Sequence, residues 1–118
     1  MNRLLLWIAA LLMVPVAALA EPEGLAGHYY LSGMTEVGSE LLLRDDGRYQ
    51  WMLAYGALDV AAEGRWSRSG DTLTLVADPG TLPEDGMASI FARMELKIEE
   101  DGTLVPTENL RGAYRKAE

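Results

Sequence analysis

The sequence predicts an all-β fold: a small antiparallel up-and-down barrel of about eight strands, with a β-sandwich as the alternative. Three features of residues 27–116 lead to this prediction. Short apolar runs alternate with polar residues at a period of two, which is typical of half-buried strands. Turn sequences containing Gly separate these runs at short intervals. No long amphipathic segment is available to cover a sheet, so the sheet must close on itself or pack on a second sheet.

The hairpin formed by residues 39–44 and 48–55 gives the first register. Asp45-Asp46-Gly47 separates the two runs and fits a three-residue loop in which Gly takes the left-handed conformation. The predicted pairs are Leu43–Tyr49 and Leu41–Trp51. This register places the large apolar side chains of both strands on one face, whereas a two-residue loop would move Trp51 to a charged face.

Two further turns continue this meander as far as residue 77. Gly56-Ala57 fits a type II′ loop, because Gly stands at its first central position, and Ser69-Gly70 predicts another two-residue loop. Across the first loop the predicted pairs are Tyr55–Leu58, Leu53–Val60, Trp51–Ala62 and Tyr49–Gly64. Across the second they are Trp66–Leu73, Gly64–Leu75, Ala62–Ala77, Arg65–Thr74 and Ser67–Thr72. Each register keeps apolar side chains opposite apolar ones.

The remaining segments complete the set of strands. These strands are centred on Tyr29 and Leu31, on residues 92–98, and on residues 110–116. Glu100-Asp101-Gly102 repeats the acidic turn that ends in Gly and is expected to pair Ile98 with Leu104. Residues 78–88 contain two Pro and two Gly and predict a loop with room for one helical turn.

Residues 1–20 have the pattern of a cleaved secretory signal peptide. Arg3 supplies the basic start, an apolar run follows, and Ala18-Leu19-Ala20 fits the small-x-small cleavage site. We therefore expect a periplasmic or secreted protein whose mature part, residues 21–118, is a single domain without a membrane anchor. The chain has no Cys, so disulfides and attachment of lipid to Cys are impossible.

The net charge of the mature part limits the classes of partner that it can bind. Residues 21–118 carry 9 Lys and Arg against 18 Asp and Glu. This excess of negative charge disfavours nucleic acid and anionic lipid, since binding phosphates requires clustered basic side chains. Its simplest consequence is solubility.

The inner face of the predicted barrel is rich in aromatic residues. It is expected to contain Tyr29, Leu31, Leu41, Leu43, Tyr49, Trp51, Leu53, Tyr55, Leu58, Val60, Trp66, Leu73, Leu75, Met94, Leu96, Ile98, Leu104 and Tyr114. Side chains can fill such a barrel, or it can hold one small ligand. If the barrel holds a ligand, the predicted walls of its pocket are Tyr29, Trp51, Tyr55 and Trp66. If side chains fill the barrel, the same four residues pack against one another and against the rest of the core.

No catalytic or metal-binding motif stands out. His28 is the only histidine, and without Cys it cannot build a zinc site. Asp59 and Glu63 lie on the predicted outer face, where paired carboxylates face solvent. We therefore expect a non-enzymatic protein without a cofactor or metal. Met52, with Ala61, Leu42, Ala54 and Val76 predicted near it, forms an outer apolar patch that fits a partner surface or scattered apolar residues.

Residues 36–51, followed by Tyr55-Gly-Ala-Leu-Asp59 and Glu63-Gly-Arg-Trp66, resemble short exported proteobacterial proteins without an assigned activity. The strand-Asp-Gly-strand and Gly-x-Trp arrangement is also similar to lipocalin-like barrel domains. Gly27-His28-Tyr29 and Tyr114-Arg115 stand where those domains have a Gly-x-Trp and a late Arg. The resemblance implies a binding or structural role and carries over no catalytic residue.

Two functions follow as expectations. The first is a barrel that binds a small apolar ligand. The second is an interaction or inhibitor module of the cell envelope that uses an edge strand or the Met52 patch.

Overall fold

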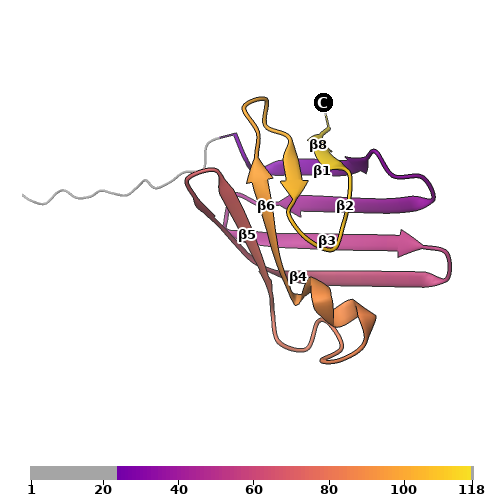
Figure 1. Cartoon of the computed structure of the whole chain (residues 1–118). Coiled ribbons are helices and arrows are strands. Elements are labelled where there is room, and N and C mark those ends of the chain that lie inside the picture. Colours follow the sequence, from indigo (N-terminus) through magenta and orange to yellow (C-terminus); the bar gives the residue numbers. More distant parts are fainter. Residues whose placement is uncertain (1–23, 118) are drawn as a thin grey trace, which may run out of the picture.

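The computed structural model describes residues 24–117 and shows a closed barrel of eight antiparallel strands in the order of the chain (Figure 1). The strands are β1 (Gly27–Ser32), β2 (Val37–Leu43), β3 (Arg48–Tyr55), β4 (Leu58–Ser69), β5 (Thr72–Ala77), β6 (Arg93–Ile98), β7 (Leu104–Pro106) and β8 (Ala113–Lys116). The predicted all-β barrel is confirmed, and the alternative prediction of a β-sandwich is wrong. The predicted signal peptide lies outside the described residues.

Three of the four predicted turn registers are confirmed. Leu41 pairs with Trp51, Tyr55 pairs with Leu58, and Ile98 pairs with Leu104. Gly56 has φ 59°, while Ala57 keeps a negative φ, as a type II′ turn requires.

The fourth register, between β4 and β5, is shifted by two residues. The loop is Gly70-Asp71 and not Ser69-Gly70, so Trp66 pairs with Leu75 and Gly64 with Ala77. Gly70 has φ 61° and occupies the first central position, as Gly56 does in the preceding turn. Because the shift is an even number of residues, each side chain stays on its predicted face.

Strand β4 loses its β5 neighbour halfway along its length. The last β4–β5 pair is Gly64–Ala77, and Asp78 adds one hydrogen bond, from its backbone N–H to the oxygen of Glu63 at 2.8 Å. A Cβ on Gly64 would lie 2.8 Å from the Cα of Ala77, so the approach of β5 at this point requires Gly. Residues 58–62 of β4 pair only with β3.

The segment between β5 and β6 is longer in its helical part than predicted. A 3₁₀ helix, η2 (Met87–Ala92), begins at the end of the predicted loop and includes Ala92, which the sequence assigns to a strand. Leu82 and Phe91 from this segment are buried in the core. In Figure 1 the segment lies below β4 in the view. It therefore supplies core side chains where β5 has left β4.

The last strands are shorter than the sequence predicts. β8 starts after Gly112, which has φ 87°, and not at Leu110. It pairs with β1 over four residues but with β7 through the single pair Leu104–Tyr114. Among residues 24–117, no helix is long and apolar enough to cross a membrane.

Candidate functional site

Three of the four predicted wall residues are buried and hydrogen-bonded. The Tyr29 hydroxyl donates to the backbone oxygen of Leu25 at 2.7 Å. The Trp66 indole donates to the oxygen of Arg44 at 2.8 Å. The Trp51 ring packs on Phe91 with centroids 4.8 Å apart. Each of these aromatic groups therefore has a protein partner inside the barrel or at its rim.

The fourth wall residue, Tyr55, lies apart from the others. Its side chain is 55% exposed at the last position of β3. It is four residues beyond Trp51 on the same strand, a distance of about 13 Å. The structure therefore brings Tyr29, Trp51 and Trp66 into one core and leaves Tyr55 at the mouth.

A hydrogen-bonded chain crosses the barrel interior. The Trp51 indole donates to the Tyr114 hydroxyl at 2.9 Å, and Ser39 Oγ lies 2.7 Å from the same hydroxyl. Ser39 donates its only hydroxyl proton to the oxygen of Met52 at 2.6 Å, so Tyr114 donates to Ser39. Burial raises the pKa of Tyr114. The chain joins β8 to β3 and β2 with every polar group satisfied.

Sequence reasoning missed Ser39 as an interior residue. It is 5% exposed and stands two positions before Leu41 on the inner face of β2. The alternation of the strand could have placed it inside. Its partner across the barrel could not be found, because Tyr114 is 75 residues away in the sequence.

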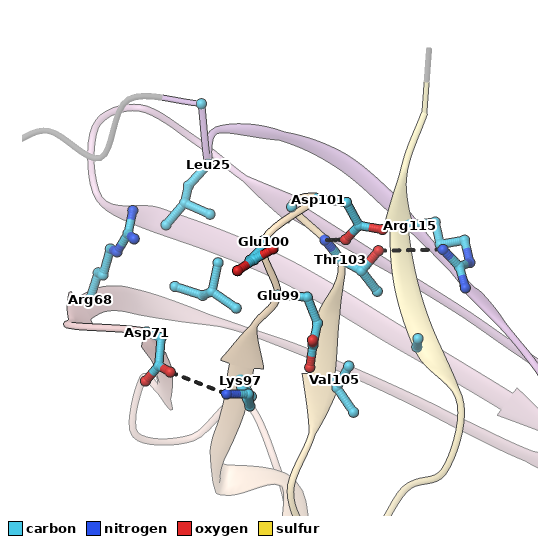
Figure 2. Close-up of a pocket in the computed structure, with 14 residues that line it drawn as sticks. Leu25, Arg68, Asp71, Lys97, Glu99, Glu100, Asp101, Thr103, Val105 and Arg115 are labelled. Atoms are coloured by element: carbon cyan, nitrogen blue, oxygen red, sulfur yellow. Dashed lines mark hydrogen bonds and ion pairs between the residues drawn. The ribbon is translucent and has the colours of Figure 1, made fainter.

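A wide groove of about 1130 Å³ lies at the end of the barrel that carries the acidic β6–β7 turn. Figure 2 shows Lys97 directed toward Asp71, at 3.2 Å, and Arg115 directed toward Thr103, at 3.4 Å. The backbone N–H of Thr103 donates to Asp101 and holds the pKa of that carboxyl below its ordinary value. Among the described charges of this groove, Lys97 and Asp71 form an ion pair, while Arg115 and Asp101 bond to groups of Thr103. Residues 24–117 contain no cluster of His, Asp and Glu that could hold a metal.

The outer apolar patch runs across the strands as a row. Tyr30, Glu40, Met52 and Ala61 are successive cross-strand neighbours from β1 to β4. Tyr30 is 45% exposed and Met52 is 37% exposed. Val76 does not belong to this patch, because it pairs with Arg65, four residues along β4 from Ala61.

His28 flanks this row on the outer face. Its ring stacks on Tyr30 with centroids 4.6 Å apart, and its Nε2 lies 2.8 Å from Glu40 Oε1. The prediction that it lies at the surface agrees with this placement, since its side chain is 43% exposed.

The row ends at an open edge of the sheet. We call the part of β4 from Leu58 to Ala62 the β4 edge. In the β3–β4 hairpin, Tyr55 and Leu58 form the hydrogen-bonded pair next to the turn, so Asp59 and Ala61 direct their N–H and C=O groups away from β3. No described residue forms a backbone hydrogen bond with these groups on that side. Both residues are exposed.

A second groove, of about 580 Å³, borders this edge. Its lining includes Gln50, Ala61, Glu63, Gly80 and Thr81. The Thr81 hydroxyl is buried and has no hydrogen-bond partner in the structure. The groove thus lies between the open backbone of β4 and residues Gly80 and Thr81 of the segment after β5.

The two carboxylates of the outer face belong to this region. Asp59 and Glu63 are both exposed, as predicted, and stand two positions on either side of Ala61. Solvent surrounds both groups, and the arrangement provides no enclosed site for acid–base chemistry.

No family model, curated protein or solved structure matches the chain.

Proposed function

We propose that this chain is an exported protein-interaction module that binds an extended segment of another protein along the β4 edge. The observation that carries this proposal is the pair of residues Asp59 and Ala61, whose four backbone hydrogen-bonding groups face away from β3 and have no backbone partner within residues 24–117. A free edge of this kind accepts an added strand, and the main-chain hydrogen bonds supply the affinity.

The surroundings of the edge support this mode of binding. Ala61 is the cross-strand neighbour of Met52, which is exposed, so an added strand extends this apolar pair on the outer face. The groove beside Glu63 and Thr81 offers space for a side chain of the added strand. The backbone groups of Asp59 and Ala61 and the groove beside Glu63 therefore lie next to one another on β4.

A small apolar ligand inside the barrel has less support. Trp51 packs on Phe91 and donates to Tyr114, while Tyr29 donates to Leu25. A ligand placed among these groups would have to displace contacts that the side chains make with one another. At the β4 edge, by contrast, the backbone groups of Asp59 and Ala61 have no backbone partner among the described residues.

The test uses the full chain in the cells that naturally export it. A photoreactive residue replaces Gln50, which lines the groove beside Ala61, and the matched control carries it at the exposed residue Ser67, on the paired half of β4. We expect a covalent adduct with one protein from position 50 and none from position 67.

A backbone variant separates strand addition from simple proximity. Ala61→Pro removes one outward N–H without removing a β3–β4 hydrogen bond, and it is expected to abolish the adduct from position 50 while the protein is still exported. An adduct that persists in Ala61→Pro, or that forms equally from position 67, contradicts the proposal.

A further inference from the structure

We infer that the segment received by the β4 edge is basic, with Lys or Arg on alternate positions and an apolar residue between them. This inference rests on the proposed strand addition and adds the chemistry of the partner. It is carried by the charges that flank the open backbone of Ala61.

The edge presents two carboxylates that form no ion pair with a described residue. They belong to Asp59 and Glu63, which are exposed on the outer face. Two basic residues flank Glu63 on the outer face. Arg48 makes a two-point contact with Asp78, at 3.1 Å for one of its two hydrogen bonds, and Arg65, two positions along β4, forms no ion pair with a described residue. Glu63 therefore remains available to a positive charge that arrives from outside.

The register of an added antiparallel strand places its side chains. The residues opposite Asp59 and Ala61 point outward, and the residue between them, opposite Val60, points to the inner face, where Val60 is 7% exposed. A basic side chain opposite Asp59 faces that carboxylate directly. A second one, opposite Ala61, lays its aliphatic stem over Ala61 and reaches the groove beside Glu63.

The same charges argue against a second copy of this chain as the occupant. An antiparallel pair of two β4 edges brings Asp59 of one copy opposite or diagonal to Asp59 or Glu63 of the other. Like charges at these positions destabilise the pair, and the whole chain carries a formal charge of −8. Acidic residues on this strand thus prevent self-association while they favour a basic segment.

The experiment measures amide hydrogen exchange of the full mature chain with three blocked peptides as probes. Their sequences are Thr-Lys-Val-Lys-Val-Lys-Thr and the same sequence with Glu or with Ser in place of Lys, each at about 1 mM, the range of weak recognition. We expect the Lys peptide to slow exchange of the Asp59 and Ala61 amides, which lack a backbone partner on the open side of β4 in the free protein. We expect the Glu peptide to leave both amides unchanged.

Charge variants test the two carboxylates. The double variant Asp59→Asn, Glu63→Gln is expected to weaken binding of the Lys peptide by about fivefold, since each exposed ion pair contributes little. The matched control, Asp45→Asn with Glu100→Gln, removes the same charge from exposed turns at the other end of the barrel and is expected to change the affinity less than twofold.

The outcomes distinguish this inference from the function on which it rests. If the Ser or Glu peptide protects Asp59 and Ala61 as well as the Lys peptide does, strand addition stands and the basic partner is wrong. If the control variant loses as much affinity as the edge variant, net charge and not the edge attracts the peptide, and the inference is overturned. If no peptide protects the edge while the adduct from position 50 forms, the partner segment is not basic.

Discussion

Strand pairing in the barrel is incomplete in two places, between β7 and β8 and between β4 and β5. The contacts that surround these two places differ. Between β7 and β8 only Leu104 and Tyr114 are paired, yet side chains of β8 tie it to other parts of the barrel on both faces. Inside, Tyr114 is hydrogen-bonded to Trp51 and Ser39. Outside, Arg115 donates to Ser32 at 3.2 Å and to Thr103 at 3.4 Å. Beside the β4 edge, within residues 24–117, no equivalent side-chain contact bridges the position that β5 leaves.

The difference extends to the backbone of the two edges. In β7 the position that faces the unpaired side is Pro106, which has no N–H to offer to another strand. The β4 edge reads Leu-Asp-Val-Ala-Ala and keeps every N–H. The unpaired side of β7 therefore lacks a hydrogen-bond donor for an added strand, whereas the β4 edge keeps both its N–H donors and its C=O acceptors. This contrast is the reason to place the function at β4.

The largest expected effect comes from breaking the closed junction. Tyr114→Ala removes a fully buried aromatic ring and leaves Trp51 and Ser39 without their partner, so it is expected to lower the free energy of unfolding by about 3–5 kcal/mol. Tyr114→Phe keeps the ring and removes only the hydroxyl, at a cost of about 1–3 kcal/mol. Urea denaturation of both variants measures the difference. Equal losses for the two would show that the hydrogen-bonded chain, and not the ring, holds the junction.

A slightly smaller loss is expected where β5 leaves β4. Gly64→Ala places a Cβ against the backbone of Val76 and Ala77, which must move apart, at a cost of about 2–3 kcal/mol. Gly38→Ala is the matched control, because a Cβ on Gly38 meets nothing within 4 Å. Thermal unfolding of both variants measures this cost. If Gly64→Ala is as stable as the control, the end of the β4–β5 ladder is not fixed by this close approach.

The sequence predicts most of the meander for a physical reason. Side-chain alternation and turn chemistry act locally, so Asp45-Asp46-Gly47 and Gly56-Ala57 set their registers without help from the rest of the chain. The Ser69-Gly70 prediction was wrong because the hydrophobic pattern cannot distinguish registers that differ by two. Only the requirement for Gly at the first central position of the loop decides between them.

The site depends on features that no local pattern contains. That β4 continues six residues beyond its last pair with β5, down to Leu58, follows from where Asp78 turns away. Asp59 and Glu63 could be placed on the outer face from the sequence, but an outer face says nothing about a missing neighbour. The open edge is a consequence of unequal strand lengths, which the length of β4 and the loop at residues 78–86 determine together.

The buried tyrosines predict that the barrel loses stability at high pH. Burial raises the pKa of Tyr49 to about 12 and also raises the pKa of Tyr29 and Tyr114. Above pH 10 the unfolded chain loses these protons while the folded chain keeps them, so the free energy of unfolding falls as the pH rises. The slope approaches about 1.4 kcal/mol per pH unit for each tyrosine.

Denaturation in urea between pH 9 and about pH 12 measures this slope, a range set by the ordinary and the raised tyrosine pKa. Tyr49→Phe should make the dependence shallower, because it removes one of the three groups that titrate differently in the two states. A free energy of unfolding that stays constant across this range would mean that these hydroxyls are as accessible in the folded barrel as in the unfolded chain.

The smallest expected effect is the most informative about the open edge. Ala61→Pro removes an N–H that points away from β3, so no β3–β4 hydrogen bond is lost, and the cost should be about 1 kcal/mol or less. Val60→Pro, one residue earlier, removes an N–H bonded to β3 and should cost about 3 kcal/mol or more. Urea denaturation of the two variants compares neighbouring positions of one strand. If both prolines destabilise the barrel equally, Ala61 has a partner on its outer side, and the β4 edge is not open.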